Sequence, residues 1–152
     1  MTIYLGADHR GFELKEKLKE WLKGHGYSAE DLGAHKLEPE DDYVDFAVAV
    51  AQKVSEGPDA HKGILICGSG QGMAIAANKF KGVYAALCWN EGVAKQSREH
   101  GNANVLVLPA DELPFDFAVK IVEVWLDTPF RGEERHARRL KKIYGVEGMP
   151  HD

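Results

Sequence analysis

The feature of this sequence that most constrains its fold is an apolar segment that runs directly into a glycine-rich loop. Residues 63–67 are apolar without alternation, which is typical of a strand buried on both faces, and they end at Cys67. Residues 68–72 follow as Gly-Ser-Gly-Gln-Gly, and an alanine-rich segment that favours a helix comes next. Such a junction directs backbone N–H groups and the positive end of a helix dipole at one spot, where an oxyanion or a phosphate can bind. The loop alone fits a tight structural turn equally well, so both interpretations stay open at this point.

Two common nucleotide-binding loops are excluded by spacing. A dinucleotide fingerprint has glycines at its first, third and sixth positions and an acidic residue about 20 residues further on. Here the sixth position is Met73, and the next apolar segment ends at residues 87–90 without an acid. A phosphate-binding P-loop is excluded as well, because no Gly-Lys-Ser/Thr closes the turn.

Strand-like and helix-like segments alternate along the chain. Strands are predicted over residues 2–7, 27–32, 63–67, 83–87 and 104–108. Helices are predicted after Gly11 with a stop at residues 24–26, around Phe46 to Val54, after the glycine loop, and over residues 91–99, 115–126 and 133–144, the last of them strongly basic. Trp21, Trp125 and Cys88 are assigned to the core, and Phe117 is assigned to the apolar positions of its helix, which is expected to pack against the sheet. This alternation predicts an α/β fold, a three-layer α/β/α domain on a parallel sheet. At 152 residues and 44% hydrophobic content, we expect residues 1–152 to form a single domain.

Composition narrows the classes of partner and compartment. The net charge of −5 argues against nonspecific nucleic-acid binding, so an anionic ligand must meet a local basic cluster. We expect no membrane partner, because no segment has enough consecutive apolar residues to span a bilayer and the N-terminus lacks a signal-peptide pattern. The two cysteines, Cys67 and Cys88, form no CxxC, which excludes a zinc ribbon or a disulfide framework. A cytoplasmic protein fits best.

Several chemically active side chains are predicted at one edge of the sheet. Ligands of parallel sheets bind beyond the carboxyl ends of the strands, near a switch in strand order. Asp8 and His9 follow the first strand, and Cys67 and Ser69 follow the third. The loop carrying His100 is expected at the same edge if the fifth strand runs parallel and its neighbour folds over. We therefore expect these side chains to converge.

Five separated motifs, in this order, carry a resemblance to a known family. They are Gly6-x-Asp8-His9-x-Gly11-Phe12-x-Leu14-Lys15, the segment 42–47, the segment 63–79, Ser97-Arg98-x-His100-x-x-Ala103-Asn104-Val105-Leu106, and Arg135-His136-x-x-Arg139. Together they resemble the type B ribose-5-phosphate isomerases and their galactose-6-phosphate isomerase relatives, over residues 2–144. The resemblance implies an aldose–ketose isomerase without metal or cofactor, on a five-stranded Rossmann-like sheet. It also implies a homodimer or homotetramer in which two subunits share each active site.

The resemblance assigns roles to individual positions. Cys67 would be the base that moves a proton between C1 and C2 through an enediol, and His100 would assist opening of the sugar ring. Some family members have a glutamate base where this chain has Met73, which leaves Cys67 as the candidate. The remaining implied substrate contacts are Asp8 and His9 with the sugar or its phosphate end, Ser69 with the hydroxyls, Gly68, Gly70, Gln71 and Gly72 with the enediolate oxygen, and Arg135 and Arg139 with the phosphate.

The residues support this chemistry independently. A thiol with an ordinary pKa of about 8.5 becomes a competent base if a helix N-terminus or a nearby cation stabilises the thiolate. Arg135 and Arg139 lie four residues apart, so a helix places them on one face, which suits a phosphate, although a solvated basic helix has the same pattern. A lack of clustered His, Cys and carboxylate ligands predicts no metal. The other histidines are interpreted as surface or capping residues: His25, His35, His61, His136 and His151.

The chain departs from the family pattern at three positions. Gly101 stands where an asparagine is common, and Tyr84 and Asp111 stand where arginines are common. A carboxylate in place of a guanidinium would repel a phosphate dianion. Either Arg10 restores the missing positive charge, or the substrate is not ribose 5-phosphate.

The leading interpretation is a sugar-phosphate isomerase of pentose phosphate metabolism that interconverts D-ribose 5-phosphate and D-ribulose 5-phosphate. One alternative is an isomerase of another aldose, either a hexose phosphate or an unphosphorylated sugar. Another is a sugar-binding homologue without turnover, against which the presence of Cys67, Ser69 and His100 argues.

Overall fold

Five parallel strands form the centre of the molecule. In the computed structural model, which describes residues 1–149, the strand order is β2-β1-β3-β5-β4 and every pairing is parallel. The strands are β1 (Thr2–Ala7), β2 (Ala29–Asp31), β3 (His61–Cys67), β4 (Ala85–Leu87) and β5 (Val105–Pro109). The predicted parallel α/β sheet is confirmed. His151 lies outside the described residues.

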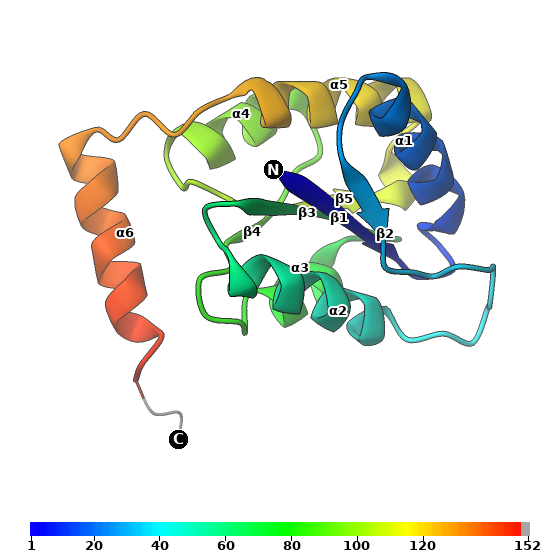
Figure 1. Ribbon diagram of the computed structural model, residues 1–152, viewed down its shortest axis with the longest axis horizontal. Helices are drawn as coiled ribbons and strands as arrows, with labels where there is room; N and C mark the ends of the chain where they lie inside the picture. The colour runs from blue at the N-terminus through cyan, green and yellow to red at the C-terminus, as the bar shows by residue number, and fades with distance from the viewer. Residues whose placement is uncertain (150–152) are drawn as a thin grey trace.

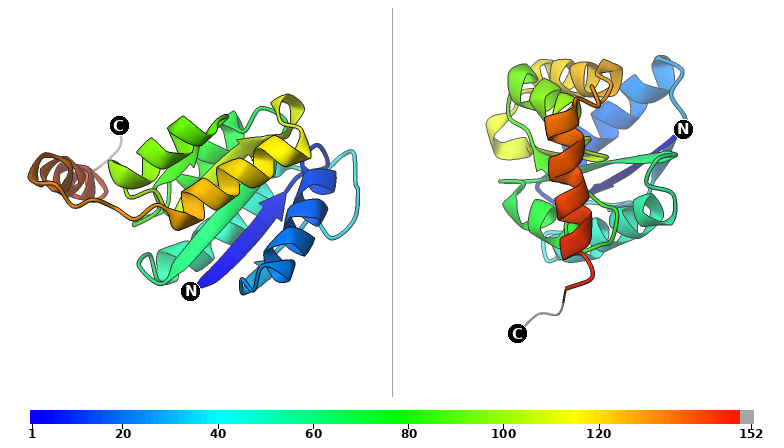
Figure 2. Two further views of the ribbon diagram at one scale, coloured as in Figure 1. Left: turned by 90° about the horizontal axis from the view of Figure 1, so that it is seen from above. Right: turned by 90° about the vertical axis from the view of Figure 1, so that its left-hand side faces the viewer.

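Helices cover both faces of this sheet (Figure 1). The helices are α1 (Phe12–Gly24), α2 (Tyr43–Glu56), α3 (Gln71–Ala77), α4 (Glu91–Glu99), α5 (Phe115–Asp127) and α6 (Glu134–Val146), with a short 3-10 helix η1 (Ala110–Glu112). Helices α1, α4 and α5 form one layer, and α2 and α3 form the other. Helix α6 belongs to neither layer and stands to the side of the body (Figure 2). Within residues 1–149, none of these helices combines the length and the apolar character that crossing a membrane requires.

The apolar run that ends at Cys67 is divided between two cores. Successive side chains of a strand point to opposite faces of the sheet. Ile64 and Ile66 accordingly pack with α1, α4 and α5, whereas Leu65 and Cys67 pack with α2 and α3. Because helices cover both faces, the strand is apolar throughout.

Two aromatic residues that were predicted to lie in the core are not buried there. Trp21 is only partly buried and stacks on His25 and Tyr27 at the end of α1. Phe117 is 55% exposed, because the buried stripe of α5 begins one residue later, at Ala118. That stripe continues at Ile121, Val122 and Trp125, which is the i, i+3, i+4, i+7 pattern of a single helix face.

The strand order reverses between β1 and β3. Strand β2 lies next to β1 on one side of the sheet, whereas β5 and β4 lie beyond β3 on the other side. The carboxyl ends of β1 and β3 therefore form the switch point at which ligands of such sheets bind. The turn of residues 8–11 and the glycine loop of residues 68–70 lie there.

Candidate active site

The glycine loop turns the chain so that a backbone N–H points back at Cys67. Gly70 has φ +77°, a left-handed conformation that favours glycine, and a Cβ at this position would overlap the Leu87 side chain. The Gly70 N–H donates a hydrogen bond of 3.1 Å to Cys67 Sγ. At least one backbone N–H donor of the loop is therefore directed at the sulfur of Cys67.

The environment of Cys67 disfavours the thiolate in the isolated chain. Burial raises its pKa, and the negative charge of Asp8 raises the pKa further. Hydrogen bonds from the Gly70, Met73 and Ser69 backbones lower the pKa of Cys67 but do not outweigh burial. Additional positive charge near the sulfur would favour the thiolate at neutral pH.

The turn after β1 lies against the end of β3. Asp8 Oδ1 accepts backbone hydrogen bonds from Arg10 at 3.0 Å and from Gly11 at 3.1 Å. The Asp8 N–H donates to the Ile66 carbonyl, and a Cβ at Gly11 would overlap that same carbonyl. Glycine at position 11 is what allows the turn to approach β3. The expected proximity of Asp8 and Cys67 is confirmed.

His9 is held by an acidic residue that the sequence did not single out. Its backbone N–H donates to Asp41 Oδ1 at 3.1 Å, and its Nδ1 lies 2.8 Å from the same oxygen. One potential ligand atom from each of Asp8, His9 and Asp41 lies within 4.8 Å of the others. The expectation that no such ligands cluster is therefore wrong, because the loop before α2 folds back onto the first turn. The His9–Asp41 contact is at hydrogen-bond distance, so these two groups are paired with each other rather than aimed at a common centre.

Arg10 covers the glycine loop but is paired with Asp111. A Cβ at Gly68 would overlap the Arg10 guanidinium, which forms an ion pair with the Asp111 carboxylate. Asp111 is anchored by its own N–H, which donates to the Gly68 carbonyl at 3.1 Å. The positive charge of Arg10 is therefore present at the mouth of the loop, and Asp111 offsets part of it.

The remaining loop residues lie on the open side. Ser69 and Gln71 are exposed, and Ser69 Oγ accepts the Gln71 N–H at 3.3 Å. Tyr43, at the start of α2, lies over Gly72, where a Cβ would overlap its ring. Apart from the absence of a side chain at position 72, nothing in the sequence pattern indicates this contact.

His100 lies at the opposite end of the sheet from Cys67. Gly63 pairs with Val105 at the start of β5, and Cys67 pairs with Pro109 at its end. His100 precedes β5, at the C-terminal end of α4, so it lies beyond the amino ends of the strands. The expectation that His100 joins Cys67 at the carboxyl edge is wrong within one chain.

Helix α6 lies beside His100. The His100 and His136 rings stack with centroids 4.2 Å apart, and His136 is buried, which corrects its interpretation as a surface or capping residue. Arg131 ties the segment before α6 to α4 through its contact with Glu99 at 3.1 Å. Arg135 and Arg139 are exposed on α6. The predicted site residues thus form two groups, one at each end of the sheet.

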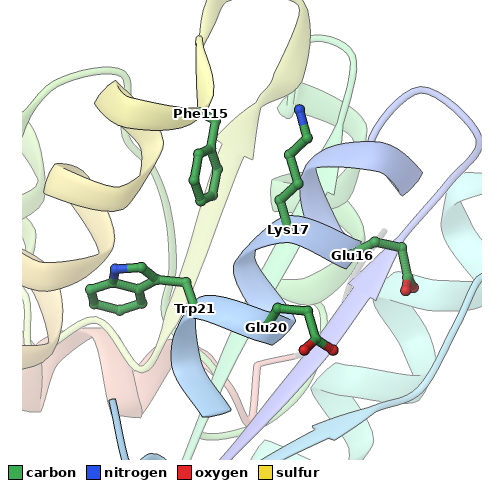
Figure 3. A pocket seen from close by; sticks show the side chains of 5 residues that line it. All are labelled: Glu16, Lys17, Glu20, Trp21 and Phe115. Carbon is green, nitrogen blue, oxygen red and sulfur yellow. The ribbon is translucent and has the colours of Figure 1, made fainter. Parts of the chain in front are cut away.

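A groove of about 580 Å³ lies elsewhere, between α1 and α5 (Figure 3). Its lining residues are Glu16, Lys17, Glu20, Trp21 and Phe115. None of the predicted site residues lines this groove, so it is not part of the candidate active site. Arg10 lines a neighbouring hollow of about 270 Å³ with Ala110 and Leu113.

The fold and the carboxyl-edge group define the class of this protein: a doubly wound α/β protein with a small-molecule site at the switch point of its sheet. Residues 3–143 match the family described as Ribose/Galactose Isomerase. The chain belongs to this family.

Relatives with known names cover almost the whole chain. A probable ribose-5-phosphate isomerase B from Mycoplasma genitalium is 44% identical over 146 residues, 96% of this chain and 95% of that protein. The ribose-5-phosphate isomerase B of Mycobacterium tuberculosis is 39% identical over 140 residues, 92% of this chain and 86% of that protein. A crystal structure of the Mycoplasma genitalium enzyme with bound ribulose-5-phosphate has a TM-score of 0.95 at 43% identity, over 98% of this chain and 97% of that one.

Proposed function

We propose that this chain interconverts ribose 5-phosphate and ribulose 5-phosphate, with Cys67 as the base. The chain is an aldose–ketose isomerase, since it belongs to that family, and a relative with 43% identity has been crystallised with ribulose-5-phosphate. The observation that supports the role of Cys67 is its position: the thiol ends β3 at the switch point, next to Asp8 and under the glycine loop.

The reaction requires a proton to move between two carbons. In the proposed mechanism the Cys67 thiolate removes the proton from C2 of the open-chain aldose, which leaves an enediolate. The proton returns to C1, and a second proton passes from the C2 oxygen to the C1 oxygen, so no atoms are gained or lost. Backbone N–H groups of residues 68–72 would stabilise the enediolate charge.

The two groups of site residues support a shared active site. His100, Arg135 and Arg139 lie at the amino end of the sheet and on α6, away from Cys67 of their own chain. In a homodimer that places this end against the carboxyl edge of the partner, these side chains would reach the partner's substrate. The two arginines would also supply positive charge that favours the thiolate. A homotetramer would contain two such dimers.

Mixed dimers test both parts of this proposal. Cys67→Ala and His100→Ala variants are each expected to lose activity on ribose 5-phosphate. A hybrid dimer contains one subunit of each variant. If each site combines Cys67 of one subunit with His100 of the other, one site of the hybrid carries both substitutions and the other site carries neither. After denaturation and refolding together, random pairing should restore about a quarter of wild-type activity, which follows from half of the dimers each having one intact site.

The hybrid is isolated through different affinity tags on the two variants. Each variant refolded alone serves as the control and should stay inactive. An inactive purified hybrid would rule out the shared site. A wild-type protein without turnover of ribose 5-phosphate would rule out the proposed substrate.

A further inference from the structure

A largely buried carboxylate outside the predicted site contacts a residue within it. Asp41 belongs to the acidic loop of residues 38–42, and its side chain is only 10% exposed. Its Oδ1 accepts the backbone N–H of His9 at 3.1 Å and lies 2.8 Å from His9 Nδ1. Its Oδ2 is buried and has no hydrogen-bond partner among the described residues. Among the described residues, both contacts of this carboxylate therefore come from His9.

This pairing explains why the carboxylate is tolerated in a buried position. A carboxylate removed from water is costly unless a hydrogen-bonding partner compensates for the loss of solvation. The neighbouring side chains of the loop, Glu38, Glu40 and Asp42, are themselves acidic and cannot compensate for it. His9 provides a donor from its backbone and a second contact from its ring.

The same oxygen fixes the ring of His9 relative to its own backbone. A carboxylate can only accept, so His9 Nδ1 carries a proton in this contact, and Nε2 is left as the ring atom available to a ligand. His9 lies between Asp8, whose charge acts on Cys67, and Arg10, whose guanidinium covers Gly68. The free ring nitrogen is thus on the turn that borders the glycine loop.

We propose that Asp41 is a positioning residue of the active site: it holds His9 with Nδ1 protonated, so that Nε2 contacts the substrate. The proposal rests on the sugar-phosphate function proposed above, because that function assigns the substrate contact to His9. Asp41 itself touches no substrate and acts only through the imidazole.

The first test is independent of activity. Nitrogen-15 NMR of the imidazole, with the His9 signals assigned through a His9→Gln variant, reports which ring nitrogen carries the proton. At alkaline pH, wild-type protein is expected to show the Nδ1–H tautomer. In Asp41→Ala the Nε2–H tautomer should predominate. An unchanged tautomer in Asp41→Ala would overturn the proposal.

The second test separates positioning from a purely structural role. Because His9 contacts substrate in both the ground state and the transition state, Asp41→Ala should raise the KM for ribose 5-phosphate about tenfold while kcat changes less than about threefold. Asp41→Asn keeps an acceptor oxygen and should restore both the tautomer and the KM. If Asp41→Ala is unstable, a comparison of Asp41→Asn with Asp41→Leu, which has no acceptor, decides the same question.

Glu40→Ala is the matched control. It removes one negative charge from the same loop at an exposed position, and it should leave the tautomer and the KM unchanged. Equal KM values for Asp41→Ala and wild type would overturn the positioning role. If the wild type shows the expected tautomer but does not turn over ribose 5-phosphate, the proposed substrate is wrong and the Asp41–His9 pairing stands.

Discussion

The sulfur of Cys67 accepts a hydrogen bond of 3.1 Å from the backbone N–H of Gly70, yet burial still raises the pKa of this thiol. The loop donors and the burial of the strand end therefore act in opposite directions on the same group. The thiolate of the proposed base therefore forms more readily when further positive charge or a higher pH favours it.

The first prediction concerns the pH dependence of turnover. Because the pKa of Cys67 is raised, the thiolate fraction increases with pH across the neutral range, and kcat/KM for ribose 5-phosphate should increase with it between about pH 6 and about pH 8. Cys67→Ser should lower kcat by roughly 10²–10⁴, the usual contribution of a general base. Steady-state kinetics over this range measures both effects.

Cys88 provides the control for the thiol chemistry. It is fully buried, and burial raises its pKa to about 11, so Cys88→Ala should retain the wild-type pH profile. Alkylation by iodoacetamide, followed by mass spectrometry, should modify Cys67 before Cys88. A kcat/KM that does not change with pH would argue against Cys67 as the base.

The second prediction concerns the ion pair of Arg10 and Asp111 at the mouth of the glycine loop. If Arg10 contacts the phosphate, Arg10→Ala should raise the KM for ribose 5-phosphate about tenfold, the size expected for the loss of a charge-assisted hydrogen bond. Asp111→Asn should lower this KM, because it removes the carboxylate that offsets the Arg10 charge. The decrease should be only about threefold, because both partners are well exposed and such an ion pair is weak.

Unphosphorylated ribose is the control substrate for both variants, since the phosphate contact does not exist for it. Any turnover of ribose should therefore be equally fast in wild type and in Arg10→Ala. An Arg10→Ala variant with an unchanged KM for the phosphorylated sugar would show that Arg10 does not replace the missing arginine.

The parts of the site that depend on local sequence could be predicted, and the parts that depend on strand order could not. The apolar run before Cys67 and the glycines after it act within a few residues, so the loop and the helix after it follow from the pattern. His100 follows α4 and precedes β5, so it lies beyond the amino ends of the parallel strands. Its expected place at the carboxyl edge required a neighbouring segment to fold over, which does not occur within this chain.

Contacts between distant segments were the other gap. Asp41 reaches His9 across 32 positions, and no periodic pattern links an acidic loop to a particular turn. The burial of His136 likewise depends on how α6 leaves the end of α5 and returns to His100. One of the two alternatives was that Arg10 restores the missing positive charge, and its pairing with Asp111 appears only when η1 and the glycine loop are placed together.

The third prediction concerns Gly11, where the first turn packs on β3. A Cβ at this position would overlap the backbone carbonyl of Ile66, so Gly11→Ala must displace either the turn or the strand. We expect a loss of about 1–3 kcal/mol in the free energy of unfolding, measured by urea denaturation, together with reduced kcat because Asp8 moves relative to Cys67.

Gly24→Ala is the matched control. No atom lies within 4 Å of a Cβ built at the end of α1, so this variant should be as stable as wild type or more stable by up to about 1 kcal/mol. Equal stability of the two variants would show that the turn adapts to a side chain at position 11.

The fourth prediction concerns a buried ion pair that supports α1 and β2. Lys15 is fully buried, and its Nζ lies 2.6 Å from Asp31 Oδ2 and 2.8 Å from Glu16 Oε1. Burial disfavours the ionised form of Asp31, but hydrogen bonds from Lys15, the Gly33 N–H and Lys19 outweigh it and hold the pKa of Asp31 below its ordinary value. The charged form is therefore stabilised in the folded state.

The sign of the pH dependence follows from this lowered pKa. Asp31 contributes its full stabilisation above the ordinary aspartate pKa of about 3.9, and the contribution is lost as the pH falls through the lower folded-state value. Asp31→Asn should remove this part of the acid dependence. At neutral pH, Asp31→Asn should lower the free energy of unfolding by about 3 kcal/mol, because the substitution leaves the buried Lys15 ammonium with Glu16 as its remaining partner. Urea denaturation at a series of pH values measures both quantities.

Glu13→Gln is the control, because it breaks an exposed ion pair with Lys17. It should lower the free energy of unfolding by less than about 0.5 kcal/mol. An equally small decrease for Asp31→Asn would show that the buried pair contributes no net stability.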